Sequence, residues 1–137
     1  MLTFAQRSDR SRAMTATARL ANKSPAEVQA KIWIEREGKV VLSDWRVELL
    51  QAIEEAGSLS GAATRMDVPY RTAWYKLKEI EGQLGLKLVT THSGGSDGGG
   101  STLTPEGREI VRRFQRIYRD VEDLVRRRFE REFAGSL

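Results

Sequence analysis

The 137-residue sequence contains no cysteine, only three prolines and a single histidine, His92. The absence of cysteine excludes disulfide bonds and thiolate metal ligands, and one histidine alone cannot form a zinc site. No apolar run approaches the roughly 18 residues that a membrane-spanning helix needs. No pair of carboxylates and no nucleophile–base set stands out either. We therefore expect a globular cytoplasmic protein of about one domain that is not an enzyme.

Positive charge is concentrated at the N-terminus, although the net charge of the whole chain is only +4. Residues 1–24 carry five basic side chains and one acidic one, whereas residues 25–104 carry nine basic and eleven acidic ones. A basic arm on a nearly neutral body could neutralise phosphates, although a solvated tail is the simpler interpretation. The first 25 residues lack the apolar core of a secretory signal. Their Arg- and Ser-rich composition leaves a mitochondrial transit peptide as a minor alternative to a flexible arm.

Two segments before residue 58 have clear local signals. Residues 30–42 predict a β-hairpin, because apolar residues occur in both halves and the sequence EREG between them is typical of a turn. Residues 44–56 predict a helix with one apolar stripe. Ser43 precedes this helix as an N-cap, and Gly57 follows it in a position that suits a left-handed C-cap.

A helix-turn-helix is predicted directly after this first helix. A short helix begins after Ser58 or Ser60, the sequence DVP forms a tight turn, and a longer helix covers residues 70–85. Pro69 suits the first turn of the longer helix, because its missing N–H costs nothing there. The apolar stripe of the longer helix consists of Ala73, Trp74, Leu77, Ile80 and Leu84. Many helical proteins contain such units without binding anything, so this segment alone does not decide between DNA binding and a structural role.

The start of the longer helix carries residue types that read DNA. The major groove admits one helix, whose first turns face the base edges. Arg71 can bind guanine through two hydrogen bonds, and Thr72 offers a methyl group to thymine. Lys78 is better placed for the DNA backbone. The predicted contacts of this region are Ser58, Ser60, Pro69, Tyr70, Arg71, Thr72, Tyr75, Lys76 and Lys78.

The glycine-rich sequence VTTHSGGSDGGGSTLT occupies residues 89–104. A phosphate loop is excluded, because no Lys-Ser or Lys-Thr follows at the required spacing. A flexible linker is possible, but Leu86, Leu88 and Val89 can pair as a strand with Thr102 and Leu103. The hairpin would then be the wing of a winged helix, whose glycine tip can approach sugar-phosphate closely. Its predicted contacts are Thr91, His92, Ser93, Gly94 and Gly95, although a merely solvent-exposed histidine is the simpler interpretation of His92.

A long helix is predicted over residues 105–133, with Thr104 as its N-cap and Pro105 in its first turn. Apolar residues repeat along it at spacings of three and four, and such a helix would extend on the order of 40 Å. A small domain cannot cover that length, so the stripe needs a partner, most simply the same helix of a second copy. Its first half can also pack on its own domain. The predicted dimerisation residues are Ile110, Phe114, Ile117, Tyr118, Val121, Leu124 and Val125.

Four motifs of the chain resemble the N-terminal domain of the ModE family, the molybdenum-responsive bacterial transcription regulators. They are GSLSGAA at 57–63, YRTAW at 70–74, GGSDGGG at 94–100 and LTPEG at 103–107. The first and last are shared with LysR-type regulators, whereas YRTAW followed by the glycine cluster is more specific. The resemblance covers residues 26–133. It implies a mainly α, winged helix-turn-helix that dimerises through its last helix and binds a palindromic operator, with Ala73 and Trp74 holding the recognition helix to its core.

The chain departs from that family in two respects. Pro69 stands where the family usually has serine, which removes a cap hydroxyl or a phosphate contact. ModE regulators also continue into small β-barrel domains that bind molybdate, which this sequence lacks, so we expect no cofactor in the chain and allow for a separate effector protein.

These features predict a flexible basic arm over residues 1–25, a DNA-binding domain over 26–104 and a dimerisation helix over 105–137. The function expected from the resemblance is that of a homodimeric, sequence-specific transcription regulator. The alternative is a protein-interaction module that uses the wing and the long helix without specific DNA binding.

Overall fold

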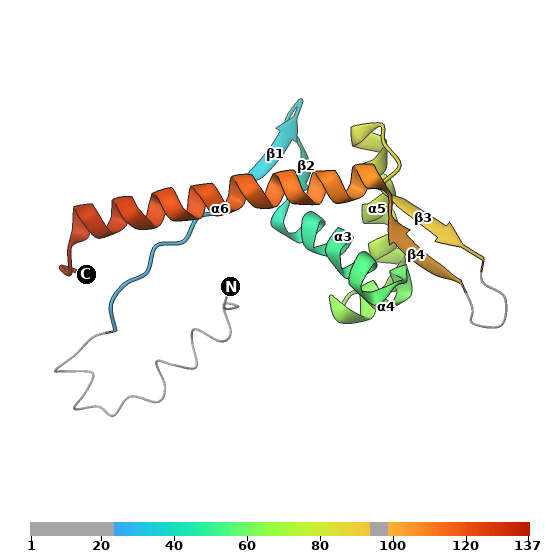
Figure 1. Cartoon of the computed structure of the whole chain (residues 1–137), viewed down its shortest axis with the longest axis horizontal. Helices are drawn as coiled ribbons and strands as arrows, with labels where there is room; N and C mark the ends of the chain where they lie inside the picture. The colour runs from blue at the N-terminus through green and yellow to red at the C-terminus, as the bar shows by residue number, and fades with distance from the viewer. Residues whose placement is uncertain (1–23, 94–98) are drawn as a thin grey trace. The chain divides into compact units, whose positions relative to one another are not determined.

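The computed structural model describes residues 24–93 and 99–137. In chain order its elements are β1 (Trp33–Arg36), β2 (Lys39–Ser43), α3 (Asp44–Ala56), α4 (Leu59–Arg65), α5 (Tyr70–Leu84), β3 (Val89–His92), β4 (Gly100–Leu103) and α6 (Pro105–Phe133) (Figure 1). Residues 30–123 form one compact unit, called the larger unit below, and residues 24–29 with 124–137 belong to a second. The predicted basic arm lies almost wholly outside the described residues.

Helix α3 provides the centre of the core of the larger unit. Its two predicted caps are confirmed, because the Ser43 hydroxyl accepts the N–H of Arg46 at 3.3 Å and Gly57 adopts a φ of 74°. The inner face of α3 buries Leu49 and Ile53 completely. Helices α4 and α5 pack against this face, so the three helices enclose a single apolar core.

Helices α4 and α5 form the predicted helix-turn-helix. Ser58, and not Ser60, caps α4, since its hydroxyl accepts the N–H of Gly61 at 2.9 Å. In the turn between α4 and α5, Asp67 adopts a left-handed backbone conformation, with a φ of 55°. Pro69 takes the N-cap position of α5, one residue before the predicted first turn, and makes no side-chain cap hydrogen bond. The start of α5 therefore lacks the hydroxyl cap that a serine would supply.

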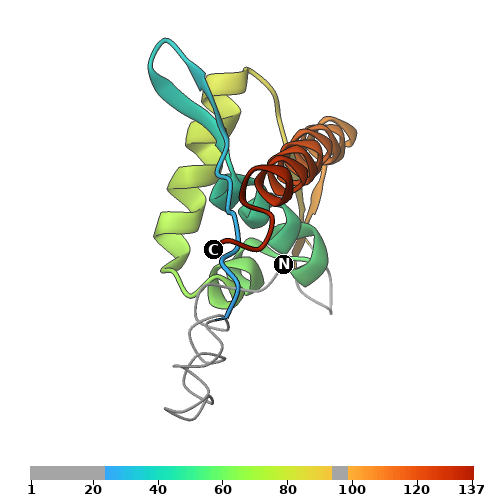
Figure 2. The same ribbon diagram turned by 90° about the vertical axis from the view of Figure 1, so that its left-hand side faces the viewer.

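The first hairpin, β1–β2, confirms the prediction for residues 30–42. Its strands are joined by Glu37 and Gly38, whose φ values of 52° and 75° are typical of the tight two-residue turns that suit strand twist. All four residues of β1 are exposed, whereas Val41 and Leu42 of β2 enter the core. Figure 2 shows the hairpin alongside the C-terminal part of α5.

The second hairpin, β3–β4, is the predicted wing. Its strands pair antiparallel from Val89 opposite Leu103 outwards. The prediction that the first strand begins at Leu86 is wrong. The N–H of Leu86 bonds back to the Glu81 carbonyl at 3.2 Å, so this residue belongs to the turn that follows α5, and β3 begins only at Val89. The glycine tip predicted over residues 94–98 lies outside the described residues.

Helix α6 begins as predicted, with the Thr104 hydroxyl accepting the N–H of Gly107 at 3.0 Å. Residue 107 must be glycine for this approach, because a Cβ there would collide with the carbonyl oxygen of Leu88 at the base of the wing. Three residues of the first half of α6 are buried in the core of the larger unit: Val111, Phe114 and Tyr118. That half of the helix is thus part of the fold that carries the helix-turn-helix.

The second unit is formed by residues 24–29 and the chain from Leu124 onwards. Helix α6 ends at Phe133, after which Ala134 and Gly135 have φ values of 24° and 81°. The N–H of Ala26 donates to the Leu137 carbonyl at 3.4 Å, so the last residue of the chain contacts the segment before the first hairpin.

Candidate nucleic-acid interface

The first two turns of α5 present a polar and aromatic surface to solvent. Tyr70 is 54% exposed and Tyr75 is 59% exposed, and Arg71 and Thr72 are exposed as well. Ala73, which points the other way, is completely buried and holds the helix against the core. The contact residues predicted at the start of α5 therefore lie on one accessible surface.

The three cations of α5 differ in their surroundings. The Lys76 ammonium lies 3.4 Å from a Glu79 oxygen, and the Lys78 ammonium lies 3.3 Å from a Glu81 oxygen. Within the described part of the chain, the side chain of Arg71 has no ion pair and no hydrogen-bond acceptor. Its guanidinium keeps all of its donors for a molecule outside the fold.

The prediction that Trp74 belongs to the buried stripe of α5 is wrong, since this residue is 40% exposed. The buried residues of the helix are Ala73, Leu77 and Ile80. Successive residues turn by about 100° around a helix, so Trp74 falls at the edge of the stripe that begins with Ala73. Its large indole extends from that edge into solvent.

One side of α5 is held by Arg46, which comes from α3 and is only 8% exposed. Its guanidinium donates to the Val41 carbonyl at 3.3 Å, to the Gln83 side-chain oxygen at 2.7 Å and to Glu79 at 2.8 Å. Arg36 of β1 adds a hydrogen bond to the Gln83 carbonyl at 2.8 Å. These two arginines attach the first hairpin to the C-terminal half of α5.

The wing is attached to α5 by Glu81, whose side chain is 12% exposed. One carboxylate oxygen accepts the N–H of Leu88 at 2.8 Å and that of Val89 at 3.4 Å, at the start of β3. The other oxygen lies 3.3 Å from the Lys78 ammonium, which compensates the negative charge. The first strand of the wing therefore leaves α5 in a defined direction.

The second strand of the wing is attached to α3 by Glu54. Its carboxylate accepts the N–H of Leu103 at 2.6 Å and two bonds from the Arg108 guanidinium at 3.1 and 3.0 Å. The hydrogen bond from Leu103 lowers the pKa of Glu54 most, burial opposes this effect, and Arg108 lowers the pKa further. The N–H of Ser101 also donates to the Gly57 carbonyl at 2.7 Å. Both strands of the wing are thus fixed at their bases.

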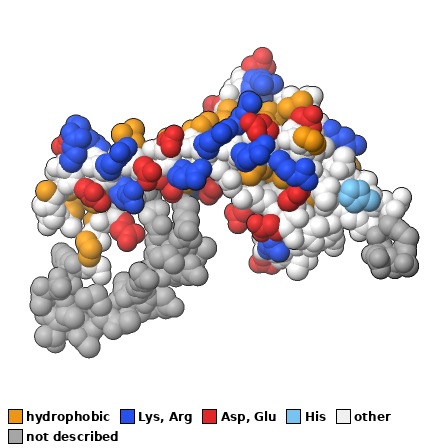
Figure 3. All heavy atoms as spheres, in the orientation of Figure 1, with side chains coloured by type: hydrophobic (Ala, Val, Ile, Leu, Met, Phe, Trp, Pro, Cys, Tyr) orange, Lys and Arg blue, Asp and Glu red, His pale blue; other side chains and the backbone are white. Residues whose placement is uncertain are grey.

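The described part of the wing carries polar side chains on its surface. Three predicted contact residues are exposed there: Thr91, His92 and Ser93. Figure 3 shows the single histidine at the surface, which confirms that it is solvent-exposed. Its Nε2 lies 3.5 Å from the Thr102 hydroxyl of the neighbouring strand. The other two predicted wing contacts, Gly94 and Gly95, lie outside the described residues.

The two serines predicted as contacts on or before α4 have different environments. The Ser58 hydroxyl accepts the N–H of Gly61, and a Cβ at residue 61 would lie 2.9 Å from it. Ser60 is exposed, and its carbonyl accepts the Thr64 hydroxyl at 3.2 Å. Ser58 therefore caps a helix, and Ser60 is the serine that offers its side chain to solvent.

The predicted dimerisation residues separate into buried and exposed groups. Phe114 and Tyr118 are 2% and 8% exposed, and the Tyr118 hydroxyl donates to the Ala30 carbonyl at 3.1 Å. These two residues fill the core of their own unit, which corrects their place on a dimerisation surface. Ile117, also in the larger unit, is 49% exposed, and Leu124, in the second unit, is 61% exposed. The remaining three are half-buried: Ile110, Val121 and Val125.

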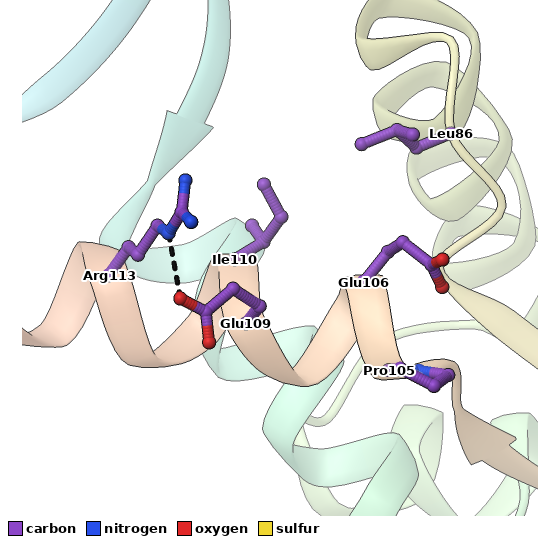
Figure 4. Close-up of a pocket in the computed structure, with 6 residues that line it drawn as sticks. All are labelled: Leu86, Pro105, Glu106, Glu109, Ile110 and Arg113. Carbon is purple, nitrogen blue, oxygen red and sulfur yellow. Dashed lines mark hydrogen bonds and ion pairs between the residues drawn. The ribbon is translucent and has the colours of Figure 1, made fainter.

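A shallow groove of about 370 Å³ lies beside the start of α6. It is lined by Leu86, Pro105, Glu106, Glu109, Ile110 and Arg113 (Figure 4). Arg113 donates to Glu109 at 2.8 Å, and this bond, with a second from Arg112, holds the pKa of Glu109 below its ordinary value. The arginine of the groove is therefore already paired with a carboxylate of the same groove. None of the predicted DNA contacts lines it.

Residues 24–93 and 99–137 contain neither of two other kinds of site. No group of histidine, aspartate and glutamate side chains there is arranged to hold a metal ion. No helix in those ranges combines the length and the apolarity needed to cross a membrane.

Sequence reasoning missed the residues that orient α5 and the wing, namely Arg46, Glu54 and Glu81. Their partners lie far away in the sequence, so no local motif reveals them. One signal was available, because Arg46 lies three residues before Leu49 and so falls on the apolar face of α3. A charge on such a face needs a partner, and here the partners come from β2 and α5.

Comparison with known families gives a match over the helix-turn-helix. Residues 46–108 match the family described as bacterial regulatory helix-turn-helix protein, lysR family. The matched segment begins in α3, includes α4, α5 and the wing, and ends in the first turn of α6. It therefore contains every side chain that anchors α5 and the wing except Arg36.

Curated relatives with names connected with molybdenum match more than half of this chain. The molybdenum transport protein ModE of Azotobacter vinelandii is 33% identical over 102 residues, which cover 74% of this chain and 38% of that protein. The molybdenum-pterin-binding protein MopB of Rhodobacter capsulatus is 36% identical over 80 residues, which cover 58% of this chain and 30% of that protein. The chain thus spans well under half the length of these relatives.

Among solved structures, full-length LysG of Corynebacterium glutamicum with its effector Arg bound has a TM-score of 0.50 and 16% sequence identity. The match covers 66% of this chain and 30% of LysG. This likeness concerns the fold alone. It agrees with the mainly α, winged helix-turn-helix architecture that the sequence predicted.

Proposed function

We propose that this chain, which contains a helix-turn-helix domain of the LysR family over residues 46–108, is a sequence-specific, DNA-binding transcription regulator. The matched family is a regulatory one, so the proposal includes no catalytic step. It also includes no cofactor, and it places the protein in the cytoplasm, where bacterial DNA is found. Relatives named as ModE proteins support the same proposal.

The observation that carries the proposal is the surface at the start of α5. Tyr70, Arg71 and Thr72 are exposed together on the second helix of a helix-turn-helix, and that helix is the one that enters the major groove in such motifs. The Arg71 side chain has no acceptor in the described chain. It can therefore present two parallel donors to guanine without first breaking an internal ion pair.

The acidic residues of α5 do not oppose this role. Glu79 is paired with Arg46 and Lys76, and Glu81 is occupied by two backbone N–H groups and Lys78. The start of α5 has no acidic residue in its first turn and no side-chain cap. A polyanion approaching this end of the helix meets a cation and backbone donors.

We further propose that the regulator binds a palindromic operator as a homodimer. Ile117 and Leu124 are apolar, strongly exposed and spaced seven residues apart on α6, which suits packing against the same helix of a second copy. A twofold dimer of this kind would present two recognition helices about 34 Å apart, one helical turn of DNA.

We infer that the controlled genes serve molybdenum handling, since the relatives are named for molybdenum transport and molybdenum-pterin binding. A separate effector protein could supply the signal. Genomic footprinting with and without molybdate would identify the operators and test this assignment.

The decisive experiment compares three variants on a footprinted operator and on random DNA over a range of salt concentrations. Arg71→Ala should weaken operator binding by about 1–3 kcal/mol, because one base contact is lost. Arg71→Lys should keep the salt dependence of binding but lose base discrimination, since lysine cannot form the two-pronged bond. Lys39→Ala removes another exposed positive charge, from the first hairpin, and serves as the matched control, which should bind normally.

Binding to operator should also fall steeply with salt, because phosphate contacts release counterions. If the wild-type chain binds neither operator nor random DNA, regulation through DNA is excluded. If Arg71→Ala kept the base preference of the wild type, Arg71 would not be a residue that reads a base.

A further inference from the structure

An exposed indole without a hydrogen-bond acceptor in the described chain lies in the second turn of α5. Trp74 is 40% exposed, and its Nε1–H has no acceptor among the described residues. Trp33 offers a contrast, because it is also exposed but donates to Glu35 at 2.6 Å. A large apolar ring with an unused donor at the surface of a recognition helix is suited to an external contact.

The side of α5 that carries Trp74 also carries Glu81, which anchors the wing. Trp74, Lys78 and Glu81 follow one another at spacings of four and three, so they share one side of the helix. Glu81 binds the first N–H groups of β3 at 2.8 and 3.4 Å. The indole therefore lies on the side from which the wing extends, and it precedes the anchored end of the helix by two turns.

The neighbours of Trp74 form a small aromatic and cationic cluster. The ring of Tyr75 lies edge-on at 5.2 Å between centroids, and the Lys78 ammonium lies 5.9 Å from the indole centroid. Lys78 is also 3.3 Å from Glu81. The Lys78 side chain is 49% exposed, so its ammonium can turn from Glu81 to a phosphate. The Glu81 carboxylate, only 12% exposed, then keeps the N–H groups of Leu88 and Val89 as its donors.

We propose that Trp74 is a DNA-contacting residue whose apolar ring packs against carbon atoms of the operator, while Lys78 moves from Glu81 to a phosphate. This inference rests on the proposed DNA binding. The core does not need the indole, since Ala73, Leu77 and Ile80 already fill the inner face of α5. The carbon surface that it meets belongs to a thymine methyl group or to a deoxyribose.

The test measures protection of the indole as well as affinity. In a Trp33→Phe/Trp45→Phe protein, Trp74 is the only fluorophore of its kind. Addition of footprinted operator should decrease acrylamide quenching of its fluorescence, because the ring becomes covered. This measurement leaves Trp74 itself unchanged, so it does not depend on whether a variant at that position folds.

Affinity provides the second measurement. Trp74→Ala should weaken operator binding about tenfold, the effect of one good base-edge contact, whereas Trp33→Ala, the matched loss of an exposed indole, should bind within twofold of wild type. Operator in which deoxyuridine replaces thymidine separates the two sources of carbon surface. If the effect of Trp74→Ala disappears on that DNA, the contact is a thymine methyl group, and if it persists, the contact is a deoxyribose.

This inference would be overturned if the wild-type chain bound operator but Trp74 fluorescence were not protected and Trp74→Ala bound with normal affinity. The proposed function would then remain intact. Failure of the wild-type chain to bind any DNA would overturn the proposed function, and the contact with it.

Discussion

The two hairpins of the larger unit have strands of similar length but are attached to α5 through opposite charges. Cations hold β1–β2, because Arg46 and Arg36 donate to side chains and a carbonyl of α5. A carboxylate holds β3, because Glu81 accepts its first N–H groups. Glu79 and Gln83, which the arginines bind, lie on a different side of the helix from Glu81, since residues two apart do not share a face.

All of these attachments lie in the C-terminal half of α5. That half is fixed by one hairpin on each of two sides, whereas the first two turns, with Tyr70 and Tyr75, remain exposed. A helix can thus be anchored at one end while the end that meets a partner stays uncovered. Rigid positioning of that end reduces the ordering that binding would otherwise require.

The attachments also differ in burial, and therefore in expected energy. Arg46 is 8% exposed, whereas the side chain of Glu54, the other carboxylate that anchors the wing, is 34% exposed. Water can replace a partner at an exposed anchor but not at a buried one. We therefore expect the buried arginine to contribute most to the free energy of unfolding and the exposed arginine, Arg36, to contribute least.

The largest effect is expected for Arg46→Ala. The substitution leaves the Val41 carbonyl and Glu79 without their main donor and removes packed methylenes, so we expect a loss of about 2–3 kcal/mol in the free energy of unfolding. This value lies below that for a fully buried pair, because Glu79 is 44% exposed and can be hydrated. Urea unfolding followed by circular dichroism measures it.

Arg46→Lys is the matched control for the charge at this position. Lysine keeps the charge but cannot reach Val41, Gln83 and Glu79 at once, so we expect an intermediate loss. If Arg46→Ala were as stable as the wild type, the first hairpin would be held by its apolar contacts alone. The two hairpins would then not be attached to α5 through opposite charges.

An intermediate effect is expected for Glu54→Gln, at the second strand of the wing. The hydrogen bond from Leu103 lowers the pKa of Glu54 in the folded state. A group with a lowered folded pKa stabilises the fold fully above its unfolded pKa of about 4.3 and loses that effect as pH falls through the folded value. At pH 7 we expect Glu54→Gln to lose about 1 kcal/mol in the free energy of unfolding. The expected loss is small because the side chain is partly exposed and water screens its charge.

The pH dependence separates this ionic effect from a packing effect. The difference in unfolding free energy between wild type and Glu54→Gln should shrink as the pH is lowered below 4, because the wild-type carboxyl then becomes neutral as well. A difference that stays constant from pH 7 to pH 3 would contradict the role assigned to the ionised carboxylate.

Local signals in the sequence predicted much of this fold. Ser43, Gly57 and Thr104 act within a few residues of themselves, so the helix ends that they cap could be read from the chain. The burial of a residue at the edge of an apolar stripe could not be predicted in this way. Helical spacing places Trp74 beside Ala73, but it does not show whether a neighbouring element covers the indole. The partners of Arg46 and Glu54 could not be predicted from the sequence either, since only the packed fold brings β2, α5 and the wing to them.

The candidate site was predictable to the same extent. Exposure of Arg71, Thr72 and His92 followed from polar residues on a helix and a hairpin tip. The separation of the apolar residues of α6 into buried and exposed ones could not be predicted from the sequence. Phe114 and Ile117 have the same helical spacing, but Phe114 is buried and Ile117 is exposed. Which of them faces the core depends on where the helix crosses the larger unit, which is a property of the tertiary structure.

The smallest effect is expected for Arg36→Ala, at the exposed arginine of β1 that binds α5 beside Arg46 of α3. Its single bond to the Gln83 carbonyl, at 2.8 Å, lies at the surface, where water can replace the donor. We expect a loss of about 0.5 kcal/mol, measured by urea unfolding under the conditions used for Arg46→Ala. Lys39→Ala on β2 is the control for loss of an exposed cation. If Arg36→Ala cost as much as Arg46→Ala, burial would not be what distinguishes the anchors, and the hairpin would depend on both arginines equally.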